Sequence, residues 1–296
     1  MAYFDRTLLQ AVWVWILKRK PGACVKTCVK TCVTLHNEDC VEGMKNQVAT
    51  SFVDTCVTSP PYNIGVKYNT YNDSQKRLEY LEWCKTWTDE VYRVLKPDGS
   101  FFLNLGACPR DPFLPYELVL QLRNRWKLQN TFHWVKSITI DGPPLVSKGH
   151  FKPINSNRFV NECHEFVFHL TKTGSVRLNR LAVGVPYADQ SNIKRWKHTT
   201  GKNLRCRGNV WFIPYKTIQS RDSQRPHPAT FPVDLVAKCL ALHGSNKSTT
   251  VVLDPFFGTG TSALAAIDYG ANEFIGYEID PCYAQYAQQQ VNKQIQ

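Results

Sequence analysis

The chain has 296 residues, of which 43% are hydrophobic and 20% are charged, so it can bury a large core and is not a mainly disordered protein. Its 36 Lys and Arg residues outnumber its 24 Asp and Glu residues and give a net charge of +12. This surplus favours a polyanionic partner, either nucleic acid or an acidic membrane surface. The 11 cysteines are too sparse in a chain of this length to indicate a disulfide-stapled scaffold.

Residues 1–32 are predicted to be an N-terminal extension. Its apolar run, residues 8–17, is too short to span a bilayer, and its basic cluster follows this run, whereas a signal peptide has its positive charges first. We therefore expect no membrane attachment. Cys24, Cys28 and Cys32 are each separated by three residues, but zinc sites usually contain tighter C-x-x-C pairs. We interpret them as thiols of a reduced cytosolic protein and predict no metal.

Strand-like and helix-like segments alternate from residue 33 onward. The segments with the clearest patterns are strands at residues 50–58, 101–106, 126–136, 164–172 and 273–280, a helix from residue 80 to the stop signals Pro97 and Gly99, a loop at residues 141–153, and a strand, glycine loop and helix within residues 248–270. This alternation predicts an α/β fold with a mostly parallel sheet and helices on both faces.

The stretch TSPPYN, residues 58–63, follows the first of these strands. Two prolines cannot continue a sheet, because each lacks a backbone N–H and has a fixed φ. The strand must therefore end in a stiff loop at its carboxyl end, which is where open α/β sheets bind ligands. An ordinary surface turn is the alternative.

The stretch DPFFGTG, residues 254–260, lies between a Val-rich strand and a helix. Gly258 and Gly260 allow a tight turn and the close approach of a ligand to the backbone. Glu278 ends the next strand about twenty residues later, where an acidic residue can bind ribose hydroxyls. The pattern fits a dinucleotide or S-adenosylmethionine, and a turn without a ligand is the alternative.

A third motif begins at residue 225 with RPHPATFP. His227 and Pro228 form a rigid lead-in, Thr230 is a plausible helix cap, and the helix is predicted to run to Gly244.

Residues 175–209 lack clear periodicity and mix basic with aromatic residues. A structureless segment of this length within a compact domain is usually functional. We predict a nucleic-acid recognition segment here, and a solvated loop is the alternative.

The order TSPPYN, HPATFP, DPFFGTGT and GYEID resembles the β group of S-adenosylmethionine-dependent DNA amino-methyltransferases, over about residues 33–296. The resemblance implies a Rossmann-like class I methyltransferase fold with a mostly parallel seven-stranded sheet. It divides the domain into a catalytic half (33–174), a DNA target-recognition insert (175–209) and a cofactor-binding half (210–296). It implies double-stranded DNA as a partner, a cognate restriction endonuclease as a candidate partner, and a cytoplasmic location, at the nucleoid if the source is prokaryotic.

The resemblance also implies the chemistry. The family methylates the exocyclic amino group of a base, whose lone pair is delocalised into the ring. Ser59 Oγ and the Pro60 carbonyl can accept the amino hydrogens, Pro61 stiffens the loop, and Tyr62 can stack on an extruded base. Serine in the first position resembles the N4-cytosine members, whereas adenine N6 members usually carry Asp or Asn. Adenine N6 methylation and an inactive nucleic-acid-binding relative remain the alternatives.

By the same resemblance, the cofactor is S-adenosyl-L-methionine and its predicted binding residues are His227, Pro228, Thr230, Phe231, Asp254, Phe256, Gly258, Gly260, Glu278 and Asp280. The predicted DNA-binding residues are Arg195, Trp196, Lys197, Lys202 and Arg205. Cys282 follows a proline but lies after the cofactor strand, so we interpret it as a core residue and not as a C5-methylating nucleophile. The polar cluster in NECHEF, residues 161–166, is interpreted as anchoring a loop.

Overall fold

The computed structural model describes residues 31–151, 154–191, 193, 195, 201–214 and 229–296. The N-terminal extension up to residue 30, with Cys24 and Cys28, lies outside this part of the chain, and Cys32 is exposed at the start of the first strand. No helix in the described ranges is both long and apolar enough to cross a membrane.

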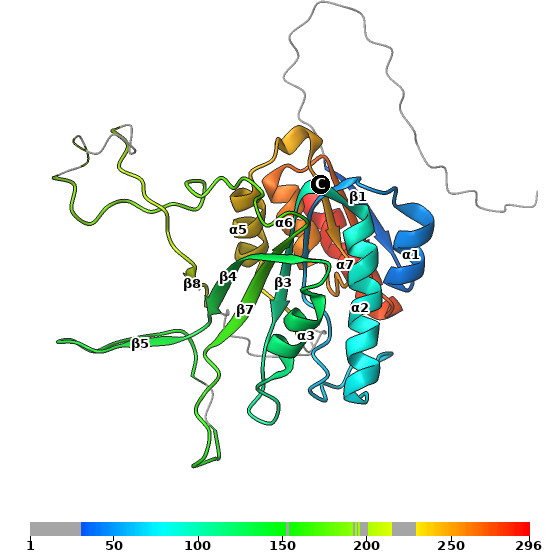
Figure 1. Ribbon diagram of the computed structural model, residues 1–296, viewed down its shortest axis with the longest axis horizontal. Coiled ribbons are helices and arrows are strands. Elements are labelled where there is room, and N and C mark those ends of the chain that lie inside the picture. Colours follow the sequence, from blue (N-terminus) through cyan, green and yellow to red (C-terminus); the bar gives the residue numbers. More distant parts are fainter. Residues whose placement is uncertain (1–30, 152–153, 192, 194, 196–200, 215–228) are drawn as a thin grey trace, which may run out of the picture.

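An eight-stranded sheet forms the centre of the molecule, in the order β1-β10-β9-β2-β3-β7-β4-β8 (Figure 1). The strands are β1 (Cys32–His36), β2 (Val53–Thr58), β3 (Leu95–Leu105), β4 (Lys127–Val135), β7 (His164–Thr171), β8 (Val210–Phe212), β9 (Val251–Asp254) and β10 (Glu273–Tyr277). All of these strands are parallel except β7, which runs antiparallel to both β3 and β4.

The sheet is mostly parallel, as predicted, but the prediction of seven strands is wrong. The additional strand is β8, which pairs with β4 at one edge of the sheet. It has only three residues, which is too short for a periodic pattern to be recognised in the sequence.

In the described part of the chain, three helices cover each face of the sheet. One face carries α1 (Cys40–Gln47), α2 (Arg77–Val94) and α3 (Leu114–Leu122), and the other carries α5 (Val233–His243), α6 (Thr261–Tyr269) and α7 (Pro281–Ile295). Neighbouring strand residues point to opposite faces, so that Cys56 belongs to the core under α2 and Val57 to the core under α5. The helices predicted on both faces are therefore confirmed.

Three local predictions differ from the structure. Residues 141–153, predicted as a loop, contain the strand β6 (Val146–Lys148), which pairs with β5 (Ile138–Ile140) in a separate two-stranded hairpin. The helix α5 begins at Val233 with Pro232 as its N-cap, so Thr230 is not the cap. The helix α2 ends at Val94, and the stop signals Pro97 and Gly99 lie within β3.

The parallel arrangement brings the carboxyl ends of distant strands to one edge. The loop after β2 begins at Ser59, the glycine loop follows β9, and Glu278 follows β10. Because β2 pairs with β9 and β9 pairs with β10, these three polar strand ends are neighbours although up to about two hundred residues of chain separate them.

Candidate active site

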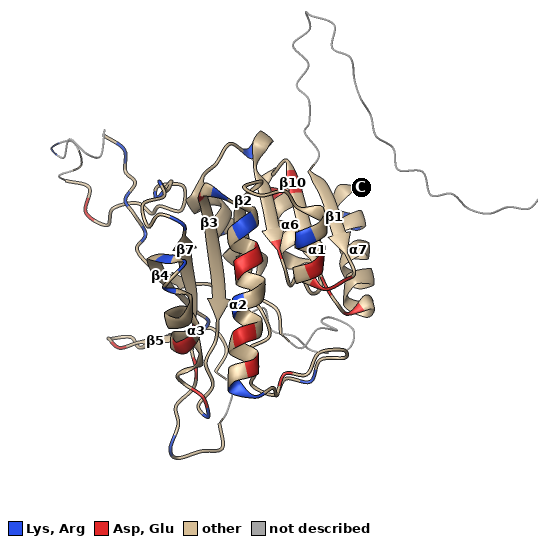
Figure 2. Ribbon diagram, turned by 45° about the vertical axis from the view of Figure 1, so that its right-hand side comes forward, with Lys and Arg blue, Asp and Glu red and all other residues tan. Residues whose placement is uncertain are grey.

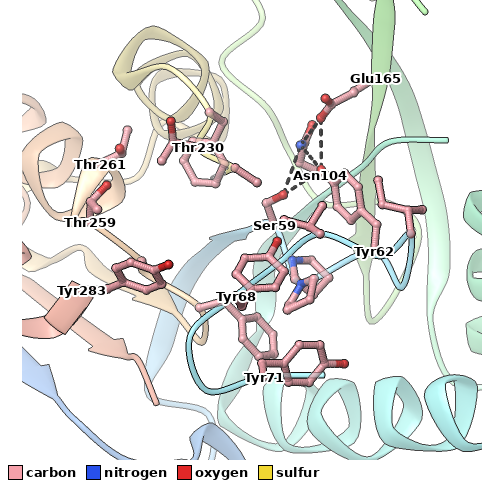
Figure 3. Close-up of a pocket in the computed structure, with 18 of the residues that line it drawn as sticks. Ser59, Tyr62, Tyr68, Tyr71, Asn104, Glu165, Thr230, Thr259, Thr261 and Tyr283 are labelled. Atoms are coloured by element: carbon pink, nitrogen blue, oxygen red, sulfur yellow. Dashed lines mark hydrogen bonds between the residues drawn. The ribbon is translucent and has the colours of Figure 1, made fainter. Parts of the chain in front are cut away.

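A cavity of about 840 Å³ opens at this edge of the sheet, within the range of small-molecule sites. Both predicted halves of the site contribute to its wall (Figure 3). The predicted residues that line it are Ser59, Pro60, Pro61, Tyr62, Thr230, Phe231, Phe256, Gly258, Glu278 and Asp280. The proline loop and the glycine loop therefore face each other across one cavity.

Four predicted cofactor residues are not in this wall. His227 and Pro228 lie outside the described residues. Asp254 and Gly260 are described but do not line the cavity. Gly260 is the left-handed N-cap of α6, with φ of 90°, and a Cβ placed there would come within 3.0 Å of Ala287 Cβ. Its role is to permit close packing of the glycine loop against α7.

Asp254 lies behind the cavity and connects the two halves of the site. It is fully buried, and its Oδ1 accepts hydrogen bonds from Thr58 Oγ1 and from the Phe256 amide. Its Oδ2 accepts from Ser262 Oγ. Burial raises the pKa of Asp254 to about 6, against the lowering effect of these donors. The last residue of β2 is thus bound directly to the last residue of β9.

Glu278 and Asp280 lie in the cavity wall on the side of the glycine loop. Glu278 Oε2 accepts from the Gly258 amide at 3.0 Å, with Gly258 at φ of 55°, and Oε1 accepts from the Asp280 amide at 2.9 Å. Burial raises the pKa of Glu278 to about 7. Asp280 Oδ1 caps α7, but Asp280 Oδ2 is buried and has no hydrogen-bond partner among the described residues. A buried acceptor without a partner indicates that a ligand donor is missing at this wall.

Aromatic rings form much of the wall, and sequence reasoning identified Tyr62, Phe231 and Phe256 among them. Tyr68, Tyr71, Trp83 and Tyr283 also line the cavity. The Trp83 ring lies 5.5 Å from the Phe256 ring and 5.4 Å from the Tyr71 ring. Such a wall suits a flat heterocycle and also a cationic group, because ring faces attract cations.

The side of the cavity formed by the proline loop contains a connected set of hydrogen bonds (Figure 3). The Ser59 and Tyr62 hydroxyl oxygens are 2.7 Å apart, and Tyr62 donates to Glu165 Oε2 at 3.0 Å. Asn104 Nδ2 lies 2.7 Å from both the Tyr62 hydroxyl and Glu165 Oε2, and 3.3 Å from Ser59 Oγ. Lys136 Nζ forms an ion pair with Glu165 Oε1 at 3.0 Å.

The Glu165 carboxylate fixes the direction of these bonds. Paired with Lys136, it acts only as an acceptor, so the single hydroxyl hydrogen of Tyr62 points towards Glu165. Ser59 must then donate its own hydrogen to Tyr62. Asn104 Nδ2 has two hydrogens, and its two shorter contacts, to Tyr62 and Glu165, account for both. The lone pairs of Ser59 Oγ are then available to a donor in the cavity, so Ser59 is held as a hydrogen-bond acceptor.

The loop after Tyr62 is held by a buried carboxylate. Asp73 is 2% exposed and accepts hydrogen bonds from the amides of Asn63, Ile64 and Val66 at 2.7 to 3.1 Å. Asn63 has a left-handed backbone, with φ of 57°, a conformation that Asn tolerates better than most residues. The stiffness expected from the prolines is therefore reinforced by contacts that the sequence did not reveal.

Sequence reasoning missed Asn104, Lys136 and Asp73. Asn104 was the one polar residue in the predicted apolar strand FFLNLG, which was a usable signal; Lys136 and Asp73 gave none. Glu165, predicted to anchor a loop, contacts the proline loop through Tyr62. Within the described ranges, no group of three or more His, Cys, Asp or Glu residues could hold a metal ion.

The predicted DNA-recognition segment, residues 175–209, begins at the far end of the sheet. Its first residues follow the carboxyl end of the antiparallel strand β7. There Gln129 Nε2 donates to the Val176 carbonyl, and the Asn179 amide donates to the Leu242 carbonyl. None of its described residues lines the cavity. Arg195, Lys202 and Arg205 are exposed, so their DNA-binding role stays a prediction, and Trp196 and Lys197 lie outside the described residues.

Known proteins resemble this chain over most of its length. It is 30% identical over 265 residues to the type II methyltransferase M.ScaI of Streptomyces caespitosus, covering 86% of this chain and 80% of that protein. It is 28% identical over 263 residues to the DNA adenine methyltransferase YhdJ of Escherichia coli (strain K12), covering 84% and 79%.

A solved structure has the same fold. It is a putative DNA modification methylase of Thermus thermophilus in complex with S-adenosyl-L-methionine, with a TM-score of 0.56, 23% sequence identity and coverage of 88% of this chain and 93% of that chain. The protein family described as DNA methylase matches residues 53–289. This match spans both sides of the cavity, and the chain therefore belongs to the DNA methylase family and is a DNA methyltransferase.

Proposed function

We propose that this methyltransferase transfers a methyl group from S-adenosyl-L-methionine to the N4 amino group of cytosine in duplex DNA, with the target base extruded into the cavity. The observation that carries this proposal is that Ser59, held as an acceptor, shares one cavity with the glycine loop and Glu278. A methyl donor and an amino acceptor can then lie side by side, and proximity of this kind lowers a barrier substantially.

The cofactor side fits S-adenosyl-L-methionine. Glu278 offers carboxylate oxygens to ribose hydroxyls, and the Gly258 backbone permits close approach. Asp280 Oδ2, buried without a partner among the described residues, can accept from a ligand amino group. The rings of Trp83 and Phe256 suit a flat base and a sulfonium charge. When bound, the cofactor supplies a methyl group attached to a positively charged sulfur, and this sulfur leaves as a neutral thioether.

The chain's own residues act on the amino nitrogen. Ser59 Oγ accepts one amino hydrogen, and the Pro60 carbonyl is positioned in the same loop to accept another. Acceptors on these hydrogens favour tetrahedral nitrogen and release its lone pair from the ring. Tyr62 offers its ring face to the base while its hydroxyl is fixed by Glu165. The alkylated nitrogen becomes acidic and loses one proton to solvent, so no strong general base is needed.

The choice of cytosine rests on Ser59, because serine in this position is similar to the N4-cytosine members of the family. Adenine N6 methylation is the second candidate, since a relative with 28% identity is named as an adenine methyltransferase. Both candidates use the same acceptor and cofactor groups and differ only in the base that fits the cavity.

The proposed division of the chain follows the two sides of the cavity. Residues 33–174 supply the proline loop, Asn104 and Glu165, and residues 210–296 supply the glycine loop and Glu278. For residues 175–209 we propose a DNA-binding role outside the cavity. The names of type II methyltransferase relatives make a cognate restriction endonuclease a candidate partner.

The test is to incubate the protein with unmethylated duplex DNA and cofactor labelled in its methyl group, digest the DNA to nucleosides and identify the labelled one. N4-methylcytosine supports the proposal, N6-methyladenine supports the second candidate, and no label in DNA contradicts both. The Ser59→Ala variant should lose methyl transfer by about a hundredfold or more while keeping its cofactor affinity, because an acceptor aligned with the reacting group contributes about that much.

A further inference from the structure

The connection between β4 and β7 leaves the body of the protein at the edge where the cavity opens. We call residues 136–163 the arm; its described residues are 136–151 and 154–163. Figure 1 and Figure 2 show it projecting beyond the sheet with the β5–β6 hairpin at one side. Both its ends are fixed, because the Lys136 amide donates to the Cys163 carbonyl at 2.7 Å. The arm is therefore positioned relative to the cavity at its base and free of packing further out.

The arm carries more exposed apolar surface than a solvated loop would. Its exposed large apolar side chains, with their exposed fractions, are Ile140 53%, Leu145 63%, Val146 36%, Phe151 36%, Ile154 46%, Phe159 39% and Val160 84%. Exposed apolar side chains in this number indicate a contact surface. Phe151, Ile154 and Val160 also line the cavity, so this part of the exposed apolar surface adjoins the place where the target base must enter.

Two further features point to nucleic acid as the occupant. Lys148 and Arg158 are exposed on the arm, and the Arg158 guanidinium lies 5.1 Å from the centre of the Phe159 ring. At the base of the arm, Asn161 Oδ1 is buried at the cavity wall with no hydrogen-bond partner among the described residues. It can accept from a base that enters the cavity.

We propose that the arm is a duplex-DNA contact in which Phe159 and Val160 fill the gap left by the extruded base, while Arg158 and Lys148 contact phosphates. This inference rests on the proposed function, because only an extruded base leaves a gap. Extrusion unstacks a base step, and an apolar side chain inserted at that step offsets part of the cost. Val160 is suited to this role because it is exposed and adjoins the cavity.

The test compares two paired changes with a matched control. Phe159→Ser with Val160→Ser, called the tip variant, removes the two side chains at the tip of the proposed wedge, and Leu128→Ser removes an apolar side chain that is 48% exposed at the opposite end of β4. Affinity for unmethylated duplex DNA is measured by fluorescence anisotropy over a range of salt concentrations, together with methyl transfer and cofactor affinity. Thermal unfolding verifies that each variant folds.

The tip variant should bind duplex about ten- to a hundredfold more weakly, the size of one lost stacking contact, without a change in salt dependence. Lys148→Gln with Arg158→Gln should instead reduce the slope of log K against log salt concentration by up to about 2. Cofactor affinity should stay within about twofold of wild type in each case, as the arm touches the base and not the cofactor. Leu128→Ser should behave like wild type.

The inference is wrong if the tip variant binds and methylates duplex like wild type, or if Leu128→Ser is impaired as strongly. It is also wrong if the tip variant changes only the oligomeric state in sedimentation, because the arm would then bind a second copy of the chain. Failure of the proposed function is distinct: the wild-type protein itself would then put no methyl group on DNA.

Discussion

Glu278 should make cofactor binding depend on pH near neutrality. Its carboxylate is largely buried at the end of β10 and accepts from the Gly258 and Asp280 amides. Burial raises the pKa of Glu278 to about 7, so its charge changes between about pH 6 and 8. The ionised form accepts hydrogen bonds from ribose hydroxyls and the protonated form accepts them less well. Lowering the pH should therefore weaken binding.

The size of the effect follows from the ionised fraction of Glu278. With a pKa of about 7, the carboxylate is about nine-tenths ionised at about pH 8 and about one-tenth ionised at about pH 6. If only the ionised form binds well, the apparent Kd increases about ninefold over this interval. Glu278→Gln removes the titration and the charge-assisted hydrogen bonds. It should weaken binding at about pH 8 by about ten- to a hundredfold and make it nearly independent of pH.

The assay is isothermal titration calorimetry of the cofactor at several pH values in wild type, Glu278→Gln and a control, Glu273→Gln. Glu273 begins the same strand β10 at the end away from the cavity, and burial also raises its pKa. It therefore controls for a titrating glutamate that does not touch the cofactor. The decisive quantity is the difference in pH dependence between variants, since the ligand's own ionisations contribute equally to all three.

The same pH dependence in wild type and Glu278→Gln, or its loss in Glu273→Gln, would show that Glu278 does not control cofactor binding. Equal affinities for wild type and Glu278→Gln at about pH 8 would show the same, because the carboxylate would then not contact the ligand.

Three other outcomes are expected. Glu165→Gln should slow methyl transfer by about a hundredfold, because the new amide can donate to Tyr62 and reverse the direction of the hydrogen bond at Ser59. The Ser59→Ala, Glu165→Gln double variant should be no slower than Ser59→Ala alone. Additive losses in single-turnover rates would contradict this. Burial lowers the pKa of His169 to about 3, so the unfolded chain binds the proton more tightly. The free energy of unfolding, measured by urea denaturation, should be about 2 kcal/mol lower at about pH 5 than above about pH 6.5. A His169→Gln variant that loses as much stability over this interval would disprove the prediction. If residues 175–209 bind DNA, Lys202→Gln with Arg205→Gln should reduce the salt slope of binding by about 2, and an unchanged slope would exclude that role.

The sequence predicted the structure correctly where a residue acts on its own backbone. Proline and glycine restrict or widen φ at their own positions, so TSPPYN and DPFFGTG marked two strand ends correctly, and their common cavity followed from a parallel sheet. The resemblance to a family supplied the order of the two halves. The stop signals Pro97 and Gly99 were predicted correctly to end the helix, but they lie within β3, at an irregularity where the register with β2 passes from Leu95 directly to Ser100.

The sequence was uninformative where a role depends on distant contacts. Glu165 and Lys136 form their ion pair across 29 residues, and neither residue type nor spacing indicates it. Asp254 illustrates the opposite case: its position in the motif predicts a cofactor contact, whereas the hydrogen bonds of its carboxylate described above all lie within the protein. A motif indicates that a residue is important but not which neighbouring group it contacts.

The buried carboxylate behind the cavity has a consequence for how the enzyme can move. Asp254 accepts from Thr58 on one side and from Ser262 on the other, so one buried carboxylate joins the strand end before the proline loop to the start of the helix after the glycine loop. We therefore expect the two loops to keep their spacing during a catalytic cycle, and any rearrangement to occur in the DNA and in the segments above them.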